Sequence, residues 1–542
     1  MNFNPADLSG VLPSVILTLG ALLLLISEVF LRGVSTSASG RAGAKTSAAD
    51  AARAQLPPGA QGAALTTPQA PDRRYQAWLA AGFAAAGLWV ALSHFGDTPA
   101  SIFGGAAVSD GFGQAVAAIV CGALLLSCVL AFSYLEALKA TRGEFYALAL
   151  FSAAGMCLLA QANDLIVIFI SLEVMSLAVY CLTAYLRRGQ RPAEAAFKYF
   201  VLGSFASAVF LYGAALAFGA TGSTGLTELS RAVVATSQGH GLPGTSCLLY
   251  AAAALLSAGF AFKVAAVPFH MWVPDVYDGA PAPVTGFMAA GVKAAAFAVL
   301  VRLLVVGFGE GAIATGPRGW VQIVAGLAFL TMLVGNVLAV PQRSVKRMLA
   351  YSSIAHAGYL LVAVAAMGSS GTARAGAMQG LVFYLASYAA TVIGAFGVVA
   401  LIERKLALAG TGDDLSHWAG LSEKHPWLAA AMSLFMVSLA GIPPTAGFMA
   451  KLAVFRSAID AGLVPLAVVG VLTSAAGLYY YLRVVVYVYM HPQTRPDAVV
   501  GGHLISAGLA LAGCAVLVIW MGVAPGTFAH VAQAALAGFA GR

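Results

Sequence analysis

The sequence predicts an all-α polytopic membrane protein with about fourteen transmembrane helices. Of its 542 residues, 60% are hydrophobic and 9% are charged, and the mean hydropathy is +0.87. This leaves too little polar surface to cover a soluble globule of that size. Apolar runs of about 20 residues, enough for a helix to cross a bilayer core of about 30 Å, recur from Val11 to Val523.

These spans follow one another along most of the chain. We place their centres near residues 21, 85, 122, 153, 175, 207, 259, 294, 330, 358, 390, 440, 475 and 513. Asp7, rather than a basic segment, precedes the first run, which is too long for a cleaved signal and is expected to stay as an anchor. Residues 33–71 are rich in Ala, Gly, Ser, Thr and Pro, and predict a flexible cytoplasmic loop with no chemistry of its own.

Positive charges gather in alternate loops. One set of loops carries most of the Lys and Arg residues, including Lys139, Arg142, Arg187, Arg188, Arg191, Arg343, Lys346, Arg347, Lys424 and Arg483. The opposite set holds Arg231, Arg302, Arg318, Arg374, Arg456 and Arg542. Because short cytoplasmic loops collect positive charge, both termini are expected on the periplasmic side. The formal net charge of +8 is therefore a topology signal and not a nucleic-acid footprint.

Nothing in the sequence predicts a metal, nucleotide or redox cofactor bound by this chain. The six cysteines, at positions 121, 128, 157, 181, 247 and 514, show no CxxC or Cys/His spacing. There is no P-loop, no GxGxxG turn after a strand and no histidine pair at haem spacing. The free energy that the chain uses is therefore expected from an ion gradient or a partner protein.

The seventh span, around LLSAGFAFKVAAVPFHMW, is interrupted by a proline close to a lysine. Pro268 lacks an amide hydrogen and frees the carbonyl of Val264, directly after Lys263. Such a break is tolerated where it faces protein or water, and ion sites commonly form there. The alternative is a proline that merely kinks a packed membrane helix.

The twelfth span, SLAGIPPTAGFMAKLAVF, repeats this arrangement. Pro443 and Pro444 free the carbonyls of Leu439 and Ala440, and Lys451 follows on the same helical face. The two interrupted spans are five helices apart, and an odd offset reverses the direction of equivalent helices. We therefore expect two inverted five-helix repeats, each containing a broken helix.

This pattern divides the chain into four regions. Residues 1–110 hold the N-terminal helices with the loop 33–71, and residues 503–542 hold a C-terminal helix. The two repeats, each expected to form a half-channel, occupy residues 144–306 and 318–490.

Five charged residues lie inside apolar spans, where each costs about 2.5 to 3.5 kcal/mol on insertion scales. They are Glu173, Lys198, Lys263, Lys293 and Lys451. Proton transport across the membrane is the function that best explains so many buried charges.

Glu173 and Lys198 suggest a switch. A buried glutamate beside a buried lysine keeps both ionised, and moving the glutamate away would release a proton from Lys198 or Lys263. Two alternatives stay open: a static ion pair, or a Lys198 side chain that extends to the cytoplasmic face.

Lys293 and His356 are further relay candidates. Lys293 lies among small residues in GFMAAGVKAAAFAVLVR, without an acidic neighbour on its own helix. His356, in SSIAHAGYLL, could relay protons or could be a satisfied packing histidine. We leave Asp164, Asp275 and Asp278 out of the path because they lie at span ends.

Four motifs resemble one family. FKVAAVPFHMWVPDVYDGAPAPVT, GIPPTAGFMAKLAVF, EAAFKYFVLGS and QRSVKRMLAYSSIAHAGY are similar to the antiporter-like subunits of the proton-pumping NADH:quinone oxidoreductase, respiratory complex I. The resemblance covers about residues 110 to 490, and DVYDGAPAPV is more similar to the N type than to the M or L types. It implies a proton relay through Glu173, Lys198, Lys263, Lys293, His356 and Lys451.

The resemblance also implies the surroundings of the chain. Its partners would be an M-type antiporter-like subunit, the small membrane subunits and the lipid bilayer of a bacterial inner membrane, without nucleic acid. FMN, iron–sulfur clusters and quinone would belong to partner subunits, and this chain would hold no redox centre. Two other functions stay open: a subunit of a multisubunit Na⁺/H⁺ antiporter, and a structural scaffold that tolerates neutral substitution of its lysines.

Overall fold

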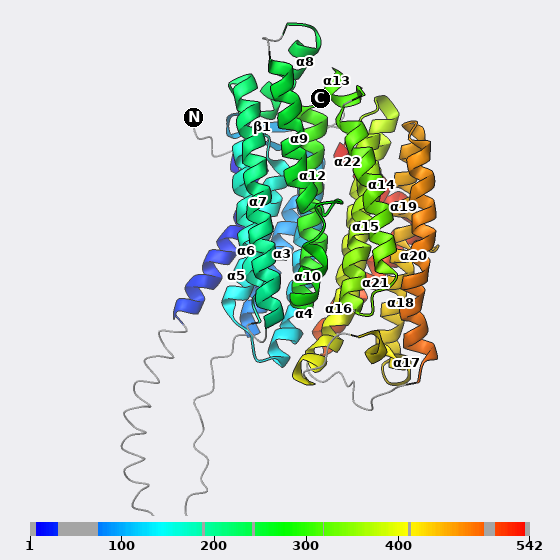
Figure 1. Ribbon diagram of the computed structural model, residues 1–542. Helices are drawn as coiled ribbons and strands as arrows, with labels where there is room; N and C mark the ends of the chain where they lie inside the picture. Colours follow the sequence, from blue (N-terminus) through cyan, green and yellow to red (C-terminus); the bar gives the residue numbers. More distant parts are fainter. Residues whose placement is uncertain are drawn as a thin grey trace, which may run out of the picture.

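The protein is an elongated bundle of long helices, as a computed structural model shows (Figure 1). The structure describes residues 7–30, 74–186, 190–240, 244–309, 311–317, 319–409, 414–492 and 504–536. The predicted loop 33–71 lies outside these residues. The predicted repeat boundaries, 144–306 and 318–490, stay a prediction.

Thirteen helices of the described part are long and apolar enough to span a membrane, and a fourteenth span is split in two. The prediction of fourteen spans is confirmed. The first six are Leu12–Phe30, α3 (Arg74–Ser93), α4 (Gly111–Ala137), α5 (Gly143–Gln161), α6 (Leu165–Thr183) and α7 (Gln190–Thr221). The seventh is α9 (Thr245–Lys263), continued by α10 (Val273–Gly279), and the eighth comprises α11 (Ala282–Phe287), a π-helical segment Met288–Val292, α12 (Lys293–Val301) and a second π-helical segment Arg302–Gly307.

The later spans follow the same pattern. They are α14 (Trp320–Ala339) preceded by the short α13 (Gly311–Thr315), α15 (Val345–Ala366), α16 (Gly371–Ala409), the split pair α18 (Pro426–Ala440) and α19 (Ala446–Asp460), α20 (Val464–Met490) and α21 (Leu504–Val523). Shorter elements lie at the bundle ends: α1 (Asp7–Gly10), α8 (Leu226–Ser237), α17 (Leu421–Lys424), α22 (Pro525–Leu536) and the antiparallel pair β1 (Ala100–Ile102) and β2 (Ala107–Ser109).

Packing places α15 and α16 at the centre of the bundle. Their most apolar stretches are almost wholly buried, whereas α7, α14 and α20 bury less than half of theirs. The helix α16 contacts α4 and α11 from the first half of the chain and α18, α19 and α21 from the second half. The helix α16 therefore joins the two halves.

Both predicted breaks are present. At the first break, α9 ends at Lys263, and the chain turns at Ala265, whose φ of 63° lies in the left-handed region. Beyond it, the N–H of Val267 donates to Thr331 Oγ1 on α14 at 2.9 Å. The break is thus satisfied by protein groups, as a non-helical backbone at membrane depth requires.

The second break lies between α18 and α19. Gly441, with φ of 83°, ends α18, and its N–H donates to Val437 and Ser438 carbonyls. Lys451 Nζ donates to the carbonyls of Leu439 and Ala440 at 2.8 and 2.9 Å. These are the two carbonyls that the prolines were predicted to free.

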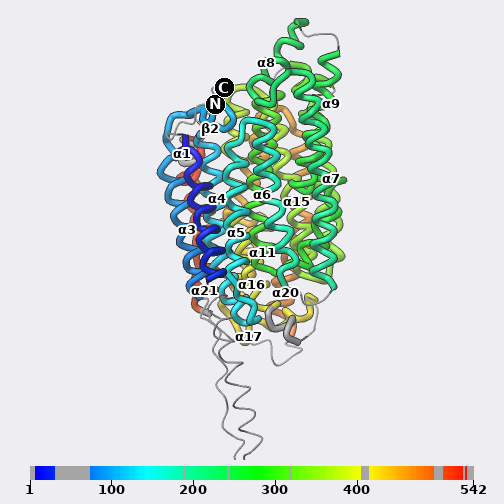
Figure 2. The backbone as a smooth tube through the Cα atoms, turned by 90° about the vertical axis from the view of Figure 1, so that its left-hand side faces the viewer, coloured from blue at the N-terminus to red at the C-terminus, as the bar shows by residue number. Residues whose placement is uncertain are grey.

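The two ends of the bundle differ. Figure 2 shows α1 at the end opposite to α17, and Figure 1 shows α22 toward the same end as α1. This placement agrees with an even number of spans. The short helix α17, which ends at Lys424, lies at the end opposite to α1.

We predict that Gly335→Ala on α14 destabilises the bundle while Gly326→Ala on the same helix does not. A Cβ at Gly335 would lie 2.5 Å from the backbone nitrogen of Ala355 on α15, but a Cβ at Gly326 would meet nothing within 4 Å. Overpacking of this kind costs about 1–3 kcal/mol. Thermal unfolding of the detergent-solubilised variants measures it, and equal unfolding temperatures would contradict the close approach of α14 and α15.

Candidate functional site

Lys263, the last residue of α9, is buried against α6. Its Nζ donates to Ser176 Oγ at 2.9 Å and to Tyr180 OH at 3.1 Å. The ammonium also lies 5.2 Å from the ring centre of Tyr180 and 5.4 Å from that of Tyr199, within cation–π range. The broken helix therefore delivers its lysine to hydroxyl groups and aromatic faces, without a carboxylate in direct contact.

Glu173 lies one turn before Ser176 on α6 and accepts a hydrogen bond from Ser207 Oγ on α7 at 2.5 Å. It shares its helix with the two hydroxyl partners of Lys263. The pairing of Glu173 with Lys198, expected from the sequence, is wrong. Ser207 and Lys198 are nine residues apart on α7, which separates them by about 13.5 Å along the helix axis, so Glu173 cannot be level with both.

Lys198 pairs with other acids. Its Nζ lies 2.7 Å from Glu194 Oε1 and 2.8 Å from Asp275 Oδ2, and its side chain is 40% exposed. This matches the alternative in which the side chain extends toward the membrane surface. Asp275, set aside in the sequence analysis as a residue at a span end, also accepts from Arg347 Nη1 at 2.9 Å.

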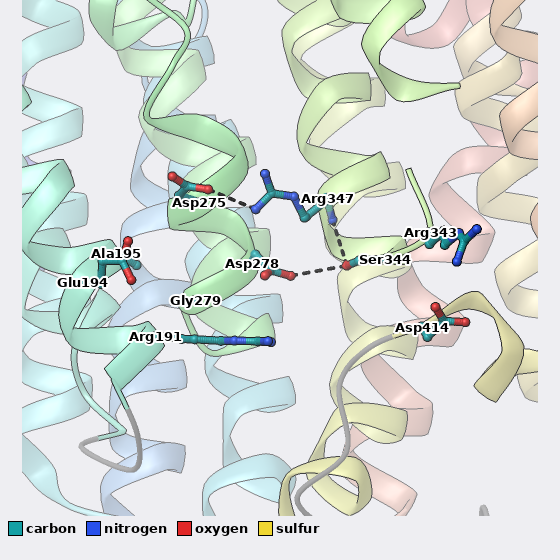
Figure 3. Close-up of a pocket in the computed structure, with 10 residues that line it drawn as sticks. All are labelled: Arg191, Glu194, Ala195, Asp275, Asp278, Gly279, Arg343, Ser344, Arg347 and Asp414. Carbon is teal, nitrogen blue, oxygen red and sulfur yellow. Dashed lines mark hydrogen bonds and ion pairs between the residues drawn. The ribbon is translucent and has the colours of Figure 1, made fainter. Parts of the chain in front are cut away.

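Around these ion pairs lies a polar cavity of about 480 Å³ (Figure 3). Arg347 and Ser344 reach into it from the second half of the chain, toward Asp275 and Asp278 on α10; Ser344 Oγ donates to Asp278 Oδ1 at 3.3 Å. The remaining lining residues are Arg191, Glu194, Ala195, Gly279, Arg343 and Asp414. The cavity therefore opens between the two halves, at the bundle end where positive charge gathers.

Asp414 supplies a fixed negative charge to this cavity. The backbone N–H of Ser416 donates to Asp414 Oδ1 at 2.8 Å, and this bond holds the pKa of the carboxyl below its ordinary value. Asp414 is therefore ionised throughout the neutral pH range.

Lys293 connects the two halves deeper in the bundle. It begins α12, directly after the π-helical segment Met288–Val292, and π-helical segments are frequent at functional sites. Its Nζ donates to both the carbonyl and the Oγ of Ser353 on α15, each at 2.6 Å. Tyr277 OH on α10 lies 3.4 Å from the same Ser353 Oγ.

His356, one turn beyond Ser353, is held by two tyrosines. Its Nδ1 lies 2.7 Å from Tyr384 OH on α16, and its Nε2 lies 3.2 Å from Tyr481 OH on α20. Tyr481 OH also hydrogen bonds to Ser352 Oγ. A hydrogen-bonded chain of side chains therefore leads from Ser352 through Tyr481 and His356 to Tyr384. It begins one residue before Ser353, the partner of Lys293.

Lys451 occupies the second break. Besides the two carbonyls of α18, its Nζ donates to Ser474 Oγ on α20 at 2.8 Å and lies 5.3 Å from the ring centre of Tyr359. Glu173 thus lies on the same helix as the two partners of Lys263, and the partner of Lys293 lies on the same helix as His356. Between Lys263, Lys293 and Lys451 themselves, no direct hydrogen bond is present in the described part of the chain.

Comparison with known proteins places this arrangement in a family. Residues 162–477 match the NADH:quinone oxidoreductase/Mrp antiporter transmembrane (TM) family. The chain is 46% identical to NADH-quinone oxidoreductase subunit N of Myxococcus xanthus, over 97% of this chain and 96% of that protein. The chain belongs to the NADH-quinone oxidoreductase subunit N family.

Two solved structures have a similar fold. A chain of respiratory complex I from Thermus thermophilus with bound aureothin superposes with a TM-score of 0.72 at 33% identity, covering 96% of this chain and 98% of its own length. A chain of the Mrp complex from Dietzia sp. DQ12-45-1b gives a TM-score of 0.75 at 21% identity, with 97% of each chain covered. The second likeness concerns the fold alone.

Two ion pairs whose basic side chains are buried could not be seen in the sequence analysis. Lys346 is 1% exposed, and its Nζ lies 2.8 Å from both Glu403 Oε1 and the carbonyl of Ala280. The Ser344 side chain caps α15 by accepting from the Arg347 N–H, which places Lys346 inside the first helical turn. The serine directly before the apolar pattern that starts at Val345 could have indicated that helix start and removed Lys346 from the loop.

The second pair joins Arg302 to Asp110 at 2.6 Å, with both side chains almost wholly buried. Arg302 Nε also donates to the carbonyl of Ala160 at 2.6 Å. We assigned Arg302 to a loop, but apolar residues continue on both sides of it in AVLVRLLVV, so the sequence itself could have placed it within the eighth span.

No cluster of three or more His, Cys, Asp or Glu side chains suited to a metal ion occurs among the residues that the structure describes. All six cysteines are free thiols, and the nearest two, Cys121 and Cys157, place their sulfurs 3.9 Å apart. The expectation that redox cofactors reside in partner subunits stays a prediction.

We predict that Lys346→Met destabilises the protein more than the double change Lys346→Met with Glu403→Gln. Lys346→Met leaves Glu403, whose side chain is 20% exposed, without its ammonium partner. The cost is expected to lie below the value of about 3–5 kcal/mol for a fully buried pair, and neutralising Glu403 relieves it. Thermal unfolding of the two single variants and the double variant gives the coupling energy. The exposed Lys139→Met is the control, and strictly additive effects would show that the pair contributes no coupling.

Proposed function

We propose that this chain is a proton-translocating membrane subunit of NADH:quinone oxidoreductase, respiratory complex I. Electron transfer in other subunits would drive proton movement through its buried lysines, glutamate and histidine. The membership in the subunit N family and the buried row of ionisable side chains support this function. The catalytic redox step is not assigned to this chain, which would act as a translocating subunit of the enzyme.

One observation carries the proposal: Lys263, Lys293 and Lys451 are hydrogen-bonded to hydroxyls and carbonyls, not to carboxylates. Each has a serine hydroxyl within 2.9 Å of its Nζ. A hydroxyl both accepts and donates, so it can solvate an ammonium or a neutral amine. These sites can therefore hold a lysine in either protonation state, which a proton relay requires.

The ion-paired lysines contrast with these three. Lys346 faces Glu403, and Lys198 faces Glu194 and Asp275. A carboxylate partner favours the charged lysine throughout. We assign Lys346 to structure, and we place Lys198 at the mouth of the path, beside the polar cavity.

The proposed path runs from the cytoplasmic face through the polar cavity and Lys198, past Glu173 to Lys263, and on to Lys293. It continues through Ser353, Ser352 and Tyr481 to His356, then to Lys451 and the outside. Water would bridge the steps at which side chains are not in contact, as hydrated sites in membrane transport proteins allow.

The proposed setting is a bacterial inner membrane with both termini periplasmic. Short cytoplasmic loops are rich in Lys and Arg, and α17 lies at the bundle end opposite to α1. FMN, iron–sulfur clusters and quinone would reside in partner subunits, and the M-type and small membrane subunits would be its neighbours.

A second candidate is a subunit of a multisubunit Na⁺/H⁺ antiporter. The family model that residues 162–477 match describes Mrp antiporter membrane segments as well as those of NADH:quinone oxidoreductase, which favours this function as the second candidate. Transport in vesicles with and without Na⁺ separates the two functions. Proton pumping that follows NADH oxidation and ignores Na⁺ supports the first, whereas Na⁺-dependent exchange without NADH supports the second.

We predict that Lys263→Ala in the assembled complex lowers the number of protons pumped per NADH oxidised. The change removes the titratable group that Ser176 and Tyr180 hold, so the relay is interrupted at the first break. Reconstituted complex with a pH-sensitive dye and parallel NADH absorbance gives the ratio. Lys139→Ala, at an exposed lysine, is the control, and an unchanged ratio and turnover in Lys263→Ala would remove Lys263 from the path.

We predict that Lys293→Arg assembles but loses most of its pumping. Arginine keeps the positive charge and can still donate to Ser353, but it does not release its proton in a protein. Lys346→Arg, at the carboxylate-paired lysine, serves as the matched control and is expected to retain pumping. Full pumping in Lys293→Arg would mean that Lys293 acts as a fixed charge.

A further inference from the structure

The central helix α16 carries four hydroxyl side chains on one face of its buried part. They recur at positions i, i+3, i+4 and i+7, a spacing that lines one face of a helix. They are Tyr384, Ser387, Tyr388 and Thr391, and each residue is at most 3% exposed. A polar group inside a membrane bundle costs free energy unless it is hydrogen-bonded, so the partner of each hydroxyl matters.

Three of these hydroxyls are hydrogen-bonded. Tyr384 OH lies 2.7 Å from Nδ1 of His356. The hydroxyls of Ser387 and Thr391 donate to backbone carbonyls one turn earlier on α16, at 3.4 and 2.7 Å. Tyr388 is the exception, because its buried hydroxyl makes no hydrogen bond of ordinary geometry within the described residues. An unpaired hydroxyl in this position calls for a partner in another state of the protein, such as a water molecule.

Tyr388 lies beside two members of the proposed proton path. Its ring centre is 4.7 Å from Lys293 Nζ and 5.0 Å from the ring centre of His356. Its hydroxyl lies near Ser353, whose Oγ accepts from Lys293 Nζ at 2.6 Å. The face of α16 that holds Tyr384 and Tyr388 therefore spans the interval from the partner of Lys293 to His356.

This arrangement gives His356 two separate approaches. Tyr481 on α20 faces its Nε2 at 3.2 Å, whereas Tyr384 on α16 faces its Nδ1. A neutral imidazole carries a hydrogen on one nitrogen and a lone pair on the other, so either side can take up a proton in the matching tautomer. The path described above reaches Nε2 through Tyr481 and leaves Nδ1 unused.

We propose that Tyr388 is a further member of the proton relay and carries a proton from the side of Lys293 to Nδ1 of His356. Ser353 Oγ takes the proton from Lys293 as it gives its own hydrogen to the Tyr388 hydroxyl. Tyr388 gives its hydrogen to a bridging water molecule, which passes one on to Tyr384, and Tyr384 gives its own to Nδ1. Each hydroxyl and the water gain and lose one hydrogen, so the net change is a neutral Lys293 and a protonated His356.

The bridging water molecule is also the partner that the Tyr388 hydroxyl lacks. The inference rests on the proposed function, because Lys293 and His356 must both carry protons. It adds a second branch to that function, which reaches His356 from α16 instead of α20.

Tyr388→Phe in the assembled complex tests this role. The change keeps the ring beside Lys293 and His356 and removes only a hydroxyl without an ordinary hydrogen bond, so the unfolding temperature should not fall. The initial rate of proton pumping should fall by about threefold, less than the loss of about a hundredfold expected for a single obligatory proton carrier, because the route through Tyr481 remains. Reconstituted vesicles with a pH-sensitive dye measure the rate, and thermal unfolding measures the stability.

Tyr146→Phe is the matched control. The Tyr146 hydroxyl, on α5, is also buried and makes no ordinary hydrogen bond in the described part of the chain. Its ionisable neighbours include Cys128, Tyr185 and Glu136, none of which belongs to the relay. This variant should keep both the pumping rate and the unfolding temperature.

Double variants separate the two approaches to His356. Adding Tyr388→Phe to Tyr384→Phe should cause no further loss of pumping, because both residues serve Nδ1. Adding Tyr388→Phe to Tyr481→Phe should cause a larger loss than either change alone, because both approaches are then interrupted.

An unchanged pumping rate in Tyr388→Phe, together with loss of pumping in Lys293→Arg, would overturn this inference and leave the proposed path intact. Unchanged rates in both variants would overturn the path as well. A slower rate in Tyr388→Phe that comes with a lower unfolding temperature would also overturn the inference, because the hydroxyl would then be a structural group.

Discussion

The cost of holding an ammonium group in the interior of a membrane bundle shapes this structure. An unsatisfied charge there costs several kcal/mol, so each buried lysine needs partners that the regular helix cannot give. At Lys451 the partners are the two carbonyls that the broken helix leaves free. The prolines therefore do more than bend a helix: they release backbone oxygens at the depth where the lysine ends.

The first break solves the same problem differently. There the lysine turns away from the freed backbone to Ser176 and Tyr180, while Trp272 Nε1 donates to the carbonyl of Phe262. Equivalent breaks in the two halves thus satisfy their lysines by unlike means. Both partners of Lys263 are side-chain hydroxyls, which can rotate. Two of the three partners of Lys451 are fixed carbonyls, and only Ser474 offers a hydroxyl, so the release of Lys451 from the carbonyls requires movement of α18 or α19.

Much of this could be predicted from the sequence, because proline chemistry and apolar length act locally. The fourteen spans, both breaks and the carbonyls of Leu439 and Ala440 follow from those local rules. The hydrogen bond from Ser207 to Glu173 could not be predicted this way, because it depends on the axial position of α6 relative to α7. Asp275, the more distant partner of Lys198, and Glu403, the partner of Lys346, likewise come from α10 and α16, which only packing brings near.

The contacts between the two halves of the chain involve the same few helices. Val267 reaches Thr331, Asp275 reaches Arg347, and Lys293 reaches Ser353, so in each case the broken seventh span or its successor meets α14 or α15. Lys346 adds a fourth contact, from α15 back to the carbonyl of Ala280. A shift of α15 would therefore alter the wall of the polar cavity and the ligands of Lys293 in one movement. Because His356 lies on the same helix, α15 is the element on which the polar cavity, the partners of Lys293 and the position of His356 all depend.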